Sequence, residues 1–141
     1  MKLSVPGKVF LAGEYAVLER EPALVLGIDR ALSGDFRPLL RGELELRHAP
    51  SNASLTGVLR DRAAHWQGGV PDELRFAARA VQVAAGFCAE QGLPPSGLAL
   101  TYLDDFAHQG RKLGLGGSAA ASVLAVRAVC AAHGFPVTAR E

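Results

Sequence analysis

A glycine-rich run that leads into an alanine-rich segment is the part of this sequence whose residue types could do chemistry. Residues 111–120 read Arg-Lys-Leu-Gly-Leu-Gly-Gly-Ser-Ala-Ala. Glycines let the backbone turn sharply and approach an anion, and the first N–H groups of a helix are unpaired and partly positive. Ser118 is expected at the helix entrance, where its hydroxyl can cap the backbone or reach a phosphate-bound metal ion. The run therefore predicts a phosphate cradle.

Other glycine-rich motifs fit the run less well. A Walker A loop places its lysine after the glycines, whereas Lys112 precedes them. The dinucleotide fingerprint fits on spacing alone, through Gly114, Gly116 and Ala119. It also needs a strand running into the first glycine, but the polar stretch 104–111 intervenes, and the only acidic residue after the loop ends the chain. A plain tight turn before a helix remains an alternative.

A second motif lies near the amino terminus. Residues 4–18 read Ser-Val-Pro-Gly-Lys-Val-Phe-Leu-Ala-Gly-Glu-Tyr-Ala-Val-Leu. Together with residues 112–120, this segment resembles the first two motifs of the GHMP kinases, the superfamily of galactokinase, homoserine kinase, mevalonate kinase and phosphomevalonate kinase. Residues 13–15 read Gly-Glu-Tyr, where mevalonate kinases usually have Gly-Glu-His. With residues 22–25 and 28–30, they make the chain most similar to the phosphomevalonate kinases, and next to the mevalonate kinases.

The resemblance implies an α+β fold of the GHMP kinase amino-terminal type, which is similar to ribosomal protein S5 domain 2 and has a mixed sheet packed with helices. Residues 1–141 are expected to form this one ATP-binding domain, since the length suits a single core. The carboxyl-terminal half of these kinases, with its third glycine-rich motif and the catalytic aspartate, has no counterpart here. We therefore expect a truncated chain, a fragment or a split subunit, whose partner is the other half or a second copy.

The activity that the resemblance implies is transfer of the γ-phosphate of ATP, with Mg²⁺, to a small acceptor. Phosphomevalonate is the first expectation for the acceptor, and mevalonate or homoserine follows. A hypothesis of another class is a nucleotide-binding or interaction domain without catalysis.

Two candidate catalytic residues follow. Lys8 stands in an otherwise apolar strand, an awkward place for a charge unless it faces a site, and by resemblance it points toward the phosphate and the accepting oxygen. Ser118 is by resemblance the metal-associated serine. Glu14 is a second candidate for the metal shell or a partner that orients Lys8, and a structural ion pair is the alternative.

The phosphate-binding loop contains one departure from the family pattern. The common loop reads Gly-Leu-Gly-Ser-Ser-Ala, whereas this chain has glycine in place of the first serine. Gly117 loses a hydroxyl but keeps its backbone N–H, so phosphate binding should persist. Lys112 either contacts phosphate as a point charge or is solvated. The residues expected to bind ATP are Lys112, Gly114, Leu115, Gly116, Gly117, Ser118 and Ala119.

Other polar and aromatic residues give weaker signals. Asp104 and Asp105 precede the loop and either bind a cation or end a strand. The four histidines are scattered without metal-ligand spacing, which favours surface or capping roles. Trp66 either contacts adenine or, more commonly for an aromatic residue, covers an edge of the core.

Composition excludes some partners. Fifteen basic residues against 14 acidic ones give a net charge of +1, which argues against nucleic acid or an anionic membrane as a partner. No stretch approaches the length of a membrane span, and no signal-peptide core is seen, so a cytoplasmic location is expected. Cys88 and Cys130 lie in apolar helical patterns without metal-ligand spacing, which favours reduced, packed thiols.

Hydrophobic periodicity predicts strands first and helices later. The expected strands are residues 5–12, 23–28 with a continuation at 31–36, 43–47 and 98–103. Amphipathic spacing predicts a helix over 72–91, and a more apolar helix is expected over 118–133. Residues 37–69 are rich in turn formers and are interpreted as largely irregular, apart from the strand at 43–47.

Overall fold

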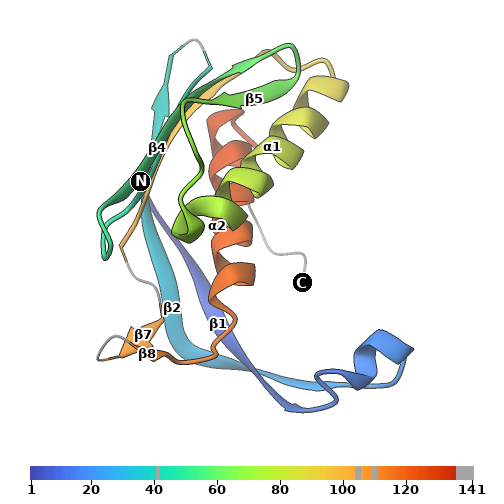
Figure 1. Ribbon diagram of the computed structural model, residues 1–141. Helices are drawn as coiled ribbons and strands as arrows, with labels where there is room; N and C mark the ends of the chain where they lie inside the picture. The colour runs from blue at the N-terminus through green and yellow to red at the C-terminus, as the bar shows by residue number, and fades with distance from the viewer. Residues whose placement is uncertain (41, 104–105, 109–110, 136–141) are drawn as a thin grey trace.

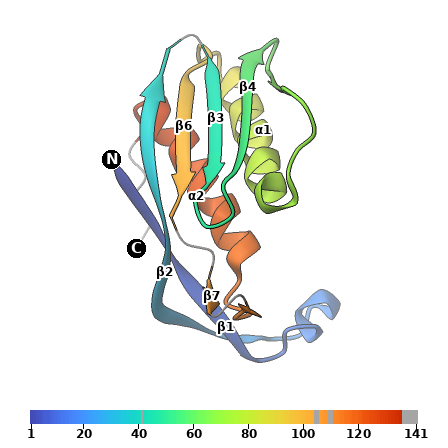
Figure 2. The same cartoon turned by 60° about the vertical axis from the view of Figure 1, so that its left-hand side comes forward.

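A computed structural model describes residues 1–40, 42–103, 106–108 and 111–135. Its main feature is a six-stranded mixed sheet with the order β1-β2-β6-β3-β4-β5. The β3–β6 pair is parallel and the other pairs are antiparallel. Figure 2 shows both long helices behind this sheet, so they cover one face of it. The strands are β1 (Lys2–Ala12), β2 (Leu24–Leu39), β3 (Glu43–His48), β4 (Ala53–Arg60), β5 (Ala63–Trp66) and β6 (Gly97–Tyr102).

Both long helices lie close to the ranges predicted from the sequence, 72–91 and 118–133. A short 3-10 turn, η2 (Asp72–Leu74), leads into α1 (Arg75–Glu90), and α2 spans Gly117–Ala132. Neither long helix has the length and hydrophobicity that a membrane span requires, within the part of the chain that is described. A two-stranded hairpin, β7 (Ala107–His108) and β8 (Arg111–Lys112), leads into α2. The α+β class and the mixed sheet packed with helices are confirmed.

The core lies between the sheet and the helices. Alternation along β3 buries Leu44 and Leu46, while Glu43, Glu45 and Arg47 face solvent. From the helices, Val81 and Leu124 are completely buried against the same face. This packing fixes α2 on the sheet, because α2 contacts α1, β1, β2 and β6.

The first two strands extend beyond the core as an arm. The end of β1, the 3-10 turn η1 (Ala16–Glu19) and the start of β2 reach away from the helices (Figure 1). Many apolar side chains of this arm are exposed, among them Tyr15 at 78% and Leu18 at 77%. The expected break in the second strand is absent, because β2 runs without interruption through residues 24–39. Its pairing with β1 instead shifts in register at two places.

The interpretation of residues 37–69 as largely irregular is wrong. Beyond β3, the chain forms β4 and β5, which pair through a two-residue turn at Asp61 and Arg62. Glycine is a residue type common in turns, but Gly57 lies in mid-strand opposite Trp66. An added Cβ there would come within 2.8 Å of the Trp66 ring. The glycine therefore makes room for the tryptophan, which packs against the core as its more common role predicted.

Candidate functional site

The fold brings Lys8 onto the glycine-rich loop, more than 100 residues away in the sequence. The Lys8 amide donates a hydrogen bond to the Leu115 carbonyl oxygen at 3.1 Å. The Lys8 side chain lies across Gly116, where a Cβ would be only 3.0 Å from Lys8 Cγ and 3.3 Å from Cε. Its ammonium stands 4.1 Å from the centre of the Phe10 ring, a favourable cation–π contact.

A pairing irregularity in the sheet underlies this placement. The register of β1 against β2 shifts between Pro6 and Lys8, so that Pro6 pairs with Ala31 and Lys8 with Gly27. Such bulges re-aim side chains and are common beside functional sites. The apolar strand therefore presents one charged side chain to the loop.

The loop itself ends in a helix with free amides. Gly114 and Gly116 have φ values of +69° and +75°, a region that side chains other than glycine rarely adopt. Gly116 is the N-cap of α2, and the first helical bond runs from the Ala120 amide to the Gly116 oxygen. The amides of residues 117–119 precede that ladder, so they are available to an anion.

Ser118 is the second residue of α2 and is exposed. No side chain caps the start of this helix, so the Ser118 hydroxyl is not used as the N-cap. Its carbonyl oxygen accepts a hydrogen bond from Ser122 Oγ at 3.0 Å, and no hydrogen bond of its hydroxyl is found among the described residues. This position suits a ligand of phosphate or of a phosphate-bound cation.

The structure gives less support to the other predicted site residues. Glu14 is exposed, just after β1 in the turn that precedes η1, and no hydrogen bond or ion pair joins it to Lys8 among the described residues. Lys112 contributes backbone to β8, and its side chain lies outside the described part of the chain. Asp104 and Asp105 also lie outside it.

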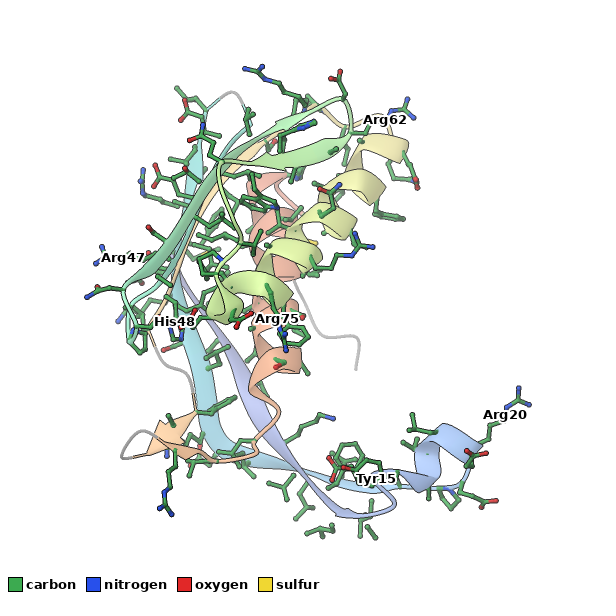
Figure 3. All side chains as sticks on the ribbon, viewed as in Figure 1. Tyr15, Arg20, Arg47, His48, Arg62 and Arg75 are labelled. Atoms are coloured by element: carbon green, nitrogen blue, oxygen red, sulfur yellow. The ribbon has the colours of Figure 1, made fainter. Side chains whose placement is uncertain are left out.

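A cavity of about 620 Å³ opens beside the loop, and sequence reasoning did not find it. It joins Gly114, Gly117 and Ser118 to residues from the end of β3 and from the start of α1. Figure 3 shows two of its lining residues, His48 at the end of β3 and Arg75 at the start of α1. Its remaining lining residues include Ser51, Asp72, Glu73, Phe76, Tyr102, Phe106 and Leu113.

Two hydrogen bonds stiffen the inner wall of this cavity. The buried Tyr102 hydroxyl donates to the Ala121 carbonyl oxygen at 2.9 Å, and burial raises the pKa of that hydroxyl. His48 Nδ1 lies 2.8 Å from Ser51 Oγ. His48 was expected at the surface, but it is only 9% exposed, because it belongs to the inward-facing set of β3. Its alternation with Leu44 and Leu46 was the signal that could have revealed this.

The histidine after α2 has the capping role that was expected. His133 Nδ1 lies 2.9 Å from the Val129 carbonyl oxygen, at the end of the helix. Within the described residues, no group of three or more histidine, cysteine, aspartate or glutamate side chains could hold a metal ion. Cys88 is buried and Cys130 half-buried, both as free thiols, and burial raises the pKa of Cys88.

Comparison with solved structures identifies the fold. The mevalonate kinase of Methanococcus jannaschii superposes with a TM-score of 0.72 at 19% identity, over 98% of this chain and 42% of that one. Phosphomevalonate kinase of Streptococcus pneumoniae, in complex with phosphomevalonate and AMPPNP, gives a TM-score of 0.66 at 23% identity, over 98% and 38%. The fold is that of the amino-terminal half of a GHMP-type small-molecule kinase.

Sequence comparison points to the same class. The phosphomevalonate kinase of Streptomyces sp. (strain CL190) is 28% identical over 151 residues, which cover 96% of this chain and 39% of the relative. The chain thus spans about two fifths of the length of the curated relative that it matches. No family model matches the chain. The resemblance to the amino-terminal half of the GHMP kinases, with phosphomevalonate kinase foremost, is confirmed.

Proposed function

We propose that this chain holds the phosphates of ATP on the loop at residues 114–119 and takes part in transfer of the γ-phosphate to a small acceptor. The observation that carries the proposal is the Lys8 side chain lying across Gly116, at the free amino-terminal amides of α2. Phosphoryl transfer depends mainly on positioning and on neutralising charge, and this arrangement supplies both a cation and amide donors.

Each part has a distinct task in the proposed reaction. The amides of residues 117–119 bind phosphate oxygens, aided by the positive end of the α2 dipole. The Lys8 ammonium neutralises charge on the transferring group, and its effect is largest in the transition state. The hydrogen bond from Lys8 N to the Leu115 oxygen fixes the strand against the loop, so the ammonium and the amides keep a constant relation.

Magnesium fits this site through Ser118. The Ser118 hydroxyl is exposed at the helix start and is not used as a cap, so it is free to act as an oxygen ligand. Glu14 remains the proposed second contributor, through the metal shell or through Lys8. When bound, Mg²⁺ would neutralise charge on the phosphate chain.

The cavity beside the loop suits the nucleoside part of ATP. Its apolar side chains, Phe76, Phe106 and Leu113, offer surfaces for a flat ring, and the carboxylates of Asp72 and Glu73 can accept hydrogen bonds from an exocyclic amine. The phosphate chain would then lead from the cavity to the loop, since Ser118 belongs to the loop and also lines the cavity.

Phosphomevalonate is the proposed acceptor, and mevalonate or homoserine is second. The support is that the curated relative is named phosphomevalonate kinase and that a structural neighbour was solved with phosphomevalonate bound. The alternative of a nucleotide-binding domain without catalysis rests on the limited span of the match, two fifths of the relative.

A phosphoryl-acceptor screen tests the proposal. The full-length gene product is incubated with γ-labelled ATP and Mg²⁺, and with phosphomevalonate, mevalonate or homoserine in parallel. We expect label transfer to phosphomevalonate and a much lower kcat in Lys8→Met, with the KM for ATP changed less. Binding of ATP without label transfer to any acceptor would favour the alternative. Label transfer that Lys8→Met leaves unchanged would refute the assigned role of Lys8.

A further inference from the structure

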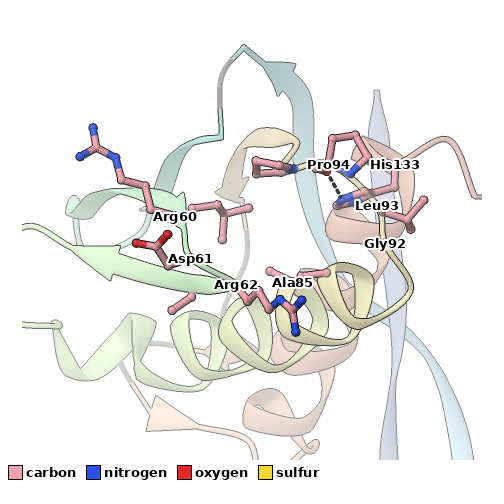
Figure 4. A pocket seen from close by; sticks show the side chains of 12 residues that line it. Arg60, Asp61, Arg62, Ala85, Gly92, Leu93, Pro94 and His133 are labelled. Atoms are coloured by element: carbon pink, nitrogen blue, oxygen red, sulfur yellow. Dashed lines mark hydrogen bonds between the residues drawn. The ribbon is translucent and has the colours of Figure 1, made fainter.

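The two ends of α2 differ in what they offer an anion. At the carboxyl end, the His133 ring reaches the connection before β6, with Nε2 3.2 Å from the Pro94 carbonyl oxygen (Figure 4). That end of a helix carries partial negative charge, whereas the amino end carries partial positive charge. Lys8 lies at the amino end, across Gly116. The proposed reaction therefore depends on what holds the Lys8 ammonium there.

The Lys8 ammonium is held by an aromatic ring and not by a carboxylate. Its nitrogen lies 4.1 Å from the centre of the Phe10 ring. Within the described residues, no carboxylate oxygen comes within 4.0 Å of this nitrogen, and no hydrogen bond of the Lys8 side chain is found. The Phe10 ring is therefore the partner that the described part of the chain gives to this charge.

Strand geometry places the ring beside the lysine. Residues two apart on a strand project on the same side, and the pairing of β1 with β2 is regular from Lys8 to Phe10. Opposite Lys8 stands Gly27, which has no side chain to compete for the ammonium. Opposite Phe10 stands Val25, and a β-branched residue facing an aromatic one supports the ring. The strand pair thus sets the ring next to Lys8 on one face.

Core packing does not account for Phe10. The residue is half-buried, but it is outside the set of partly buried apolar residues that pack against the core, a set that includes Trp66 and Leu115. Beyond Phe10, the strand continues into the exposed arm. A ring outside the core contributes little to the fold, so its contact with Lys8 is the role that the structure shows for it.

The chemical nature of this partner matters for phosphoryl transfer. A carboxylate in its place would neutralise the ammonium and would itself repel a phosphate. The face of a ring attracts a cation through its quadrupole but carries no net charge. The ammonium is therefore held with its full positive charge available. Because Gly116 holds the stem of the lysine and Phe10 its end, the side chain also loses less freedom when a phosphate binds.

We propose that Phe10 is a positioning residue, whose ring holds the Lys8 ammonium at the amino end of α2 without neutralising it. The inference rests on the proposed function, in which Lys8 acts on the transferring phosphate. Phe10 acts through Lys8 and needs no contact with the nucleotide. The contact exists before a nucleotide binds, so it can be measured without turnover.

NMR of the lysine side chains in the full-length protein tests the contact. With ¹³C-labelled lysine, the Lys8 Cε protons should lie upfield of those of solvated lysines, because the ammonium beside them stands over the ring. The spectrum of Lys8→Arg identifies this signal by its absence. Phe10→Leu should move the signal to the position of a solvated lysine. Phe87→Leu is the control, since it removes a ring 62% exposed on α1, and it should leave the signal unmoved.

Kinetics of the full-length enzyme separates the charge contact from packing. Phe10→Leu should lower kcat for label transfer about fivefold, with the KM for ATP changed less. Phe10→Tyr keeps a ring with a negative face and should retain most of the rate. Replacement of Phe10 by pentafluorophenylalanine keeps the shape but reverses the quadrupole, so it should lower kcat as Phe10→Leu does. Phe87→Leu should match the wild type.

The two measurements fail separately. A Lys8 signal that Phe10→Leu does not move would overturn the proposal, whether or not the protein transfers phosphate. In an active enzyme, a kcat unchanged by the fluorinated ring would also overturn it. A wild-type protein that transfers no label to any acceptor would refute the proposed function, and the NMR comparison would still decide whether Phe10 holds Lys8.

Discussion

The contact between Lys8 and Gly116 leads to a prediction with a built-in control. Gly114 and Gly116 have nearly the same left-handed conformation, with φ values of +69° and +75°. An added Cβ meets nothing within 4 Å at Gly114, whereas at Gly116 it comes 3.0 Å from Lys8 Cγ. Alanine at either position carries the same backbone strain, but only Gly116→Ala also pushes against Lys8.

The expected magnitudes differ accordingly. A non-glycine residue in this conformation costs about 1–2 kcal/mol, so Gly114→Ala should lower the free energy of unfolding by that amount. The push against the Lys8 side chain adds to this cost, so Gly116→Ala should be the less stable of the two variants. Urea unfolding of the two variants measures the difference. In the full-length enzyme, displacement of the Lys8 side chain should also lower kcat for Gly116→Ala more than for Gly114→Ala.

A double-mutant cycle isolates the contact. In a Lys8→Ala background the side chain that opposes the new Cβ is gone, so Gly116→Ala should then cost no more than Gly114→Ala. If the two glycine variants are equally stable and equally active with Lys8 present, the side chain does not lie across Gly116 and the reasoning is refuted.

Three further predictions follow from the site and its supports. Ser118→Ala should lower Mg-ATP turnover while the unfolding curve stays unchanged, and equal turnover would remove Ser118 as a ligand. Gly117→Ser restores the common family loop, so steady-state kinetics should show equal or better use of Mg-ATP, and a clear loss would contradict this. Burial raises the pKa of Tyr102, so the fold keeps a proton that the unfolded chain releases above about pH 10. The free energy of unfolding should therefore fall by about 1.4 kcal/mol per pH unit above pH 10. Tyr102→Phe should reduce this slope. Tyr15→Phe is the control and should leave the slope unchanged, because the Tyr15 side chain is 78% exposed.

The two long helices and the strands with clear periodicity were predictable from the sequence. Alternation at residues 43–47 and amphipathic spacing at 72–91 report directly which face is buried. The β4–β5 hairpin was missed for two reasons. Gly57 looked like a turn residue although it accommodates Trp66, and the actual turn at Asp61 and Arg62 lacks the usual glycine. The glycine in the strand and the turn without glycine both depend on contacts that form only in the folded protein.

The site was predictable in part. The glycine-rich loop and Lys8 could be named from their motifs, but their contact depends on a register shift between β1 and β2 that no local pattern encodes. The cavity beside the loop draws on the end of β3 and on η2 with the start of α1, which are all far from the loop in the sequence. His48 carried a usable signal in its inward register on β3, whereas Arg75 and Phe76 carried none, because an exposed first turn of a helix looks the same with or without a cavity.

Backbone amide NMR of the full-length protein, titrated with Mg-ATP, tests the central claim most directly. If the loop holds the phosphates, the largest shifts should fall on the amides of residues 114–119 and be lost in Gly116→Val, whose branched side chain blocks the approach. Saturable binding of Mg-ATP that leaves these amides unmoved would contradict the account.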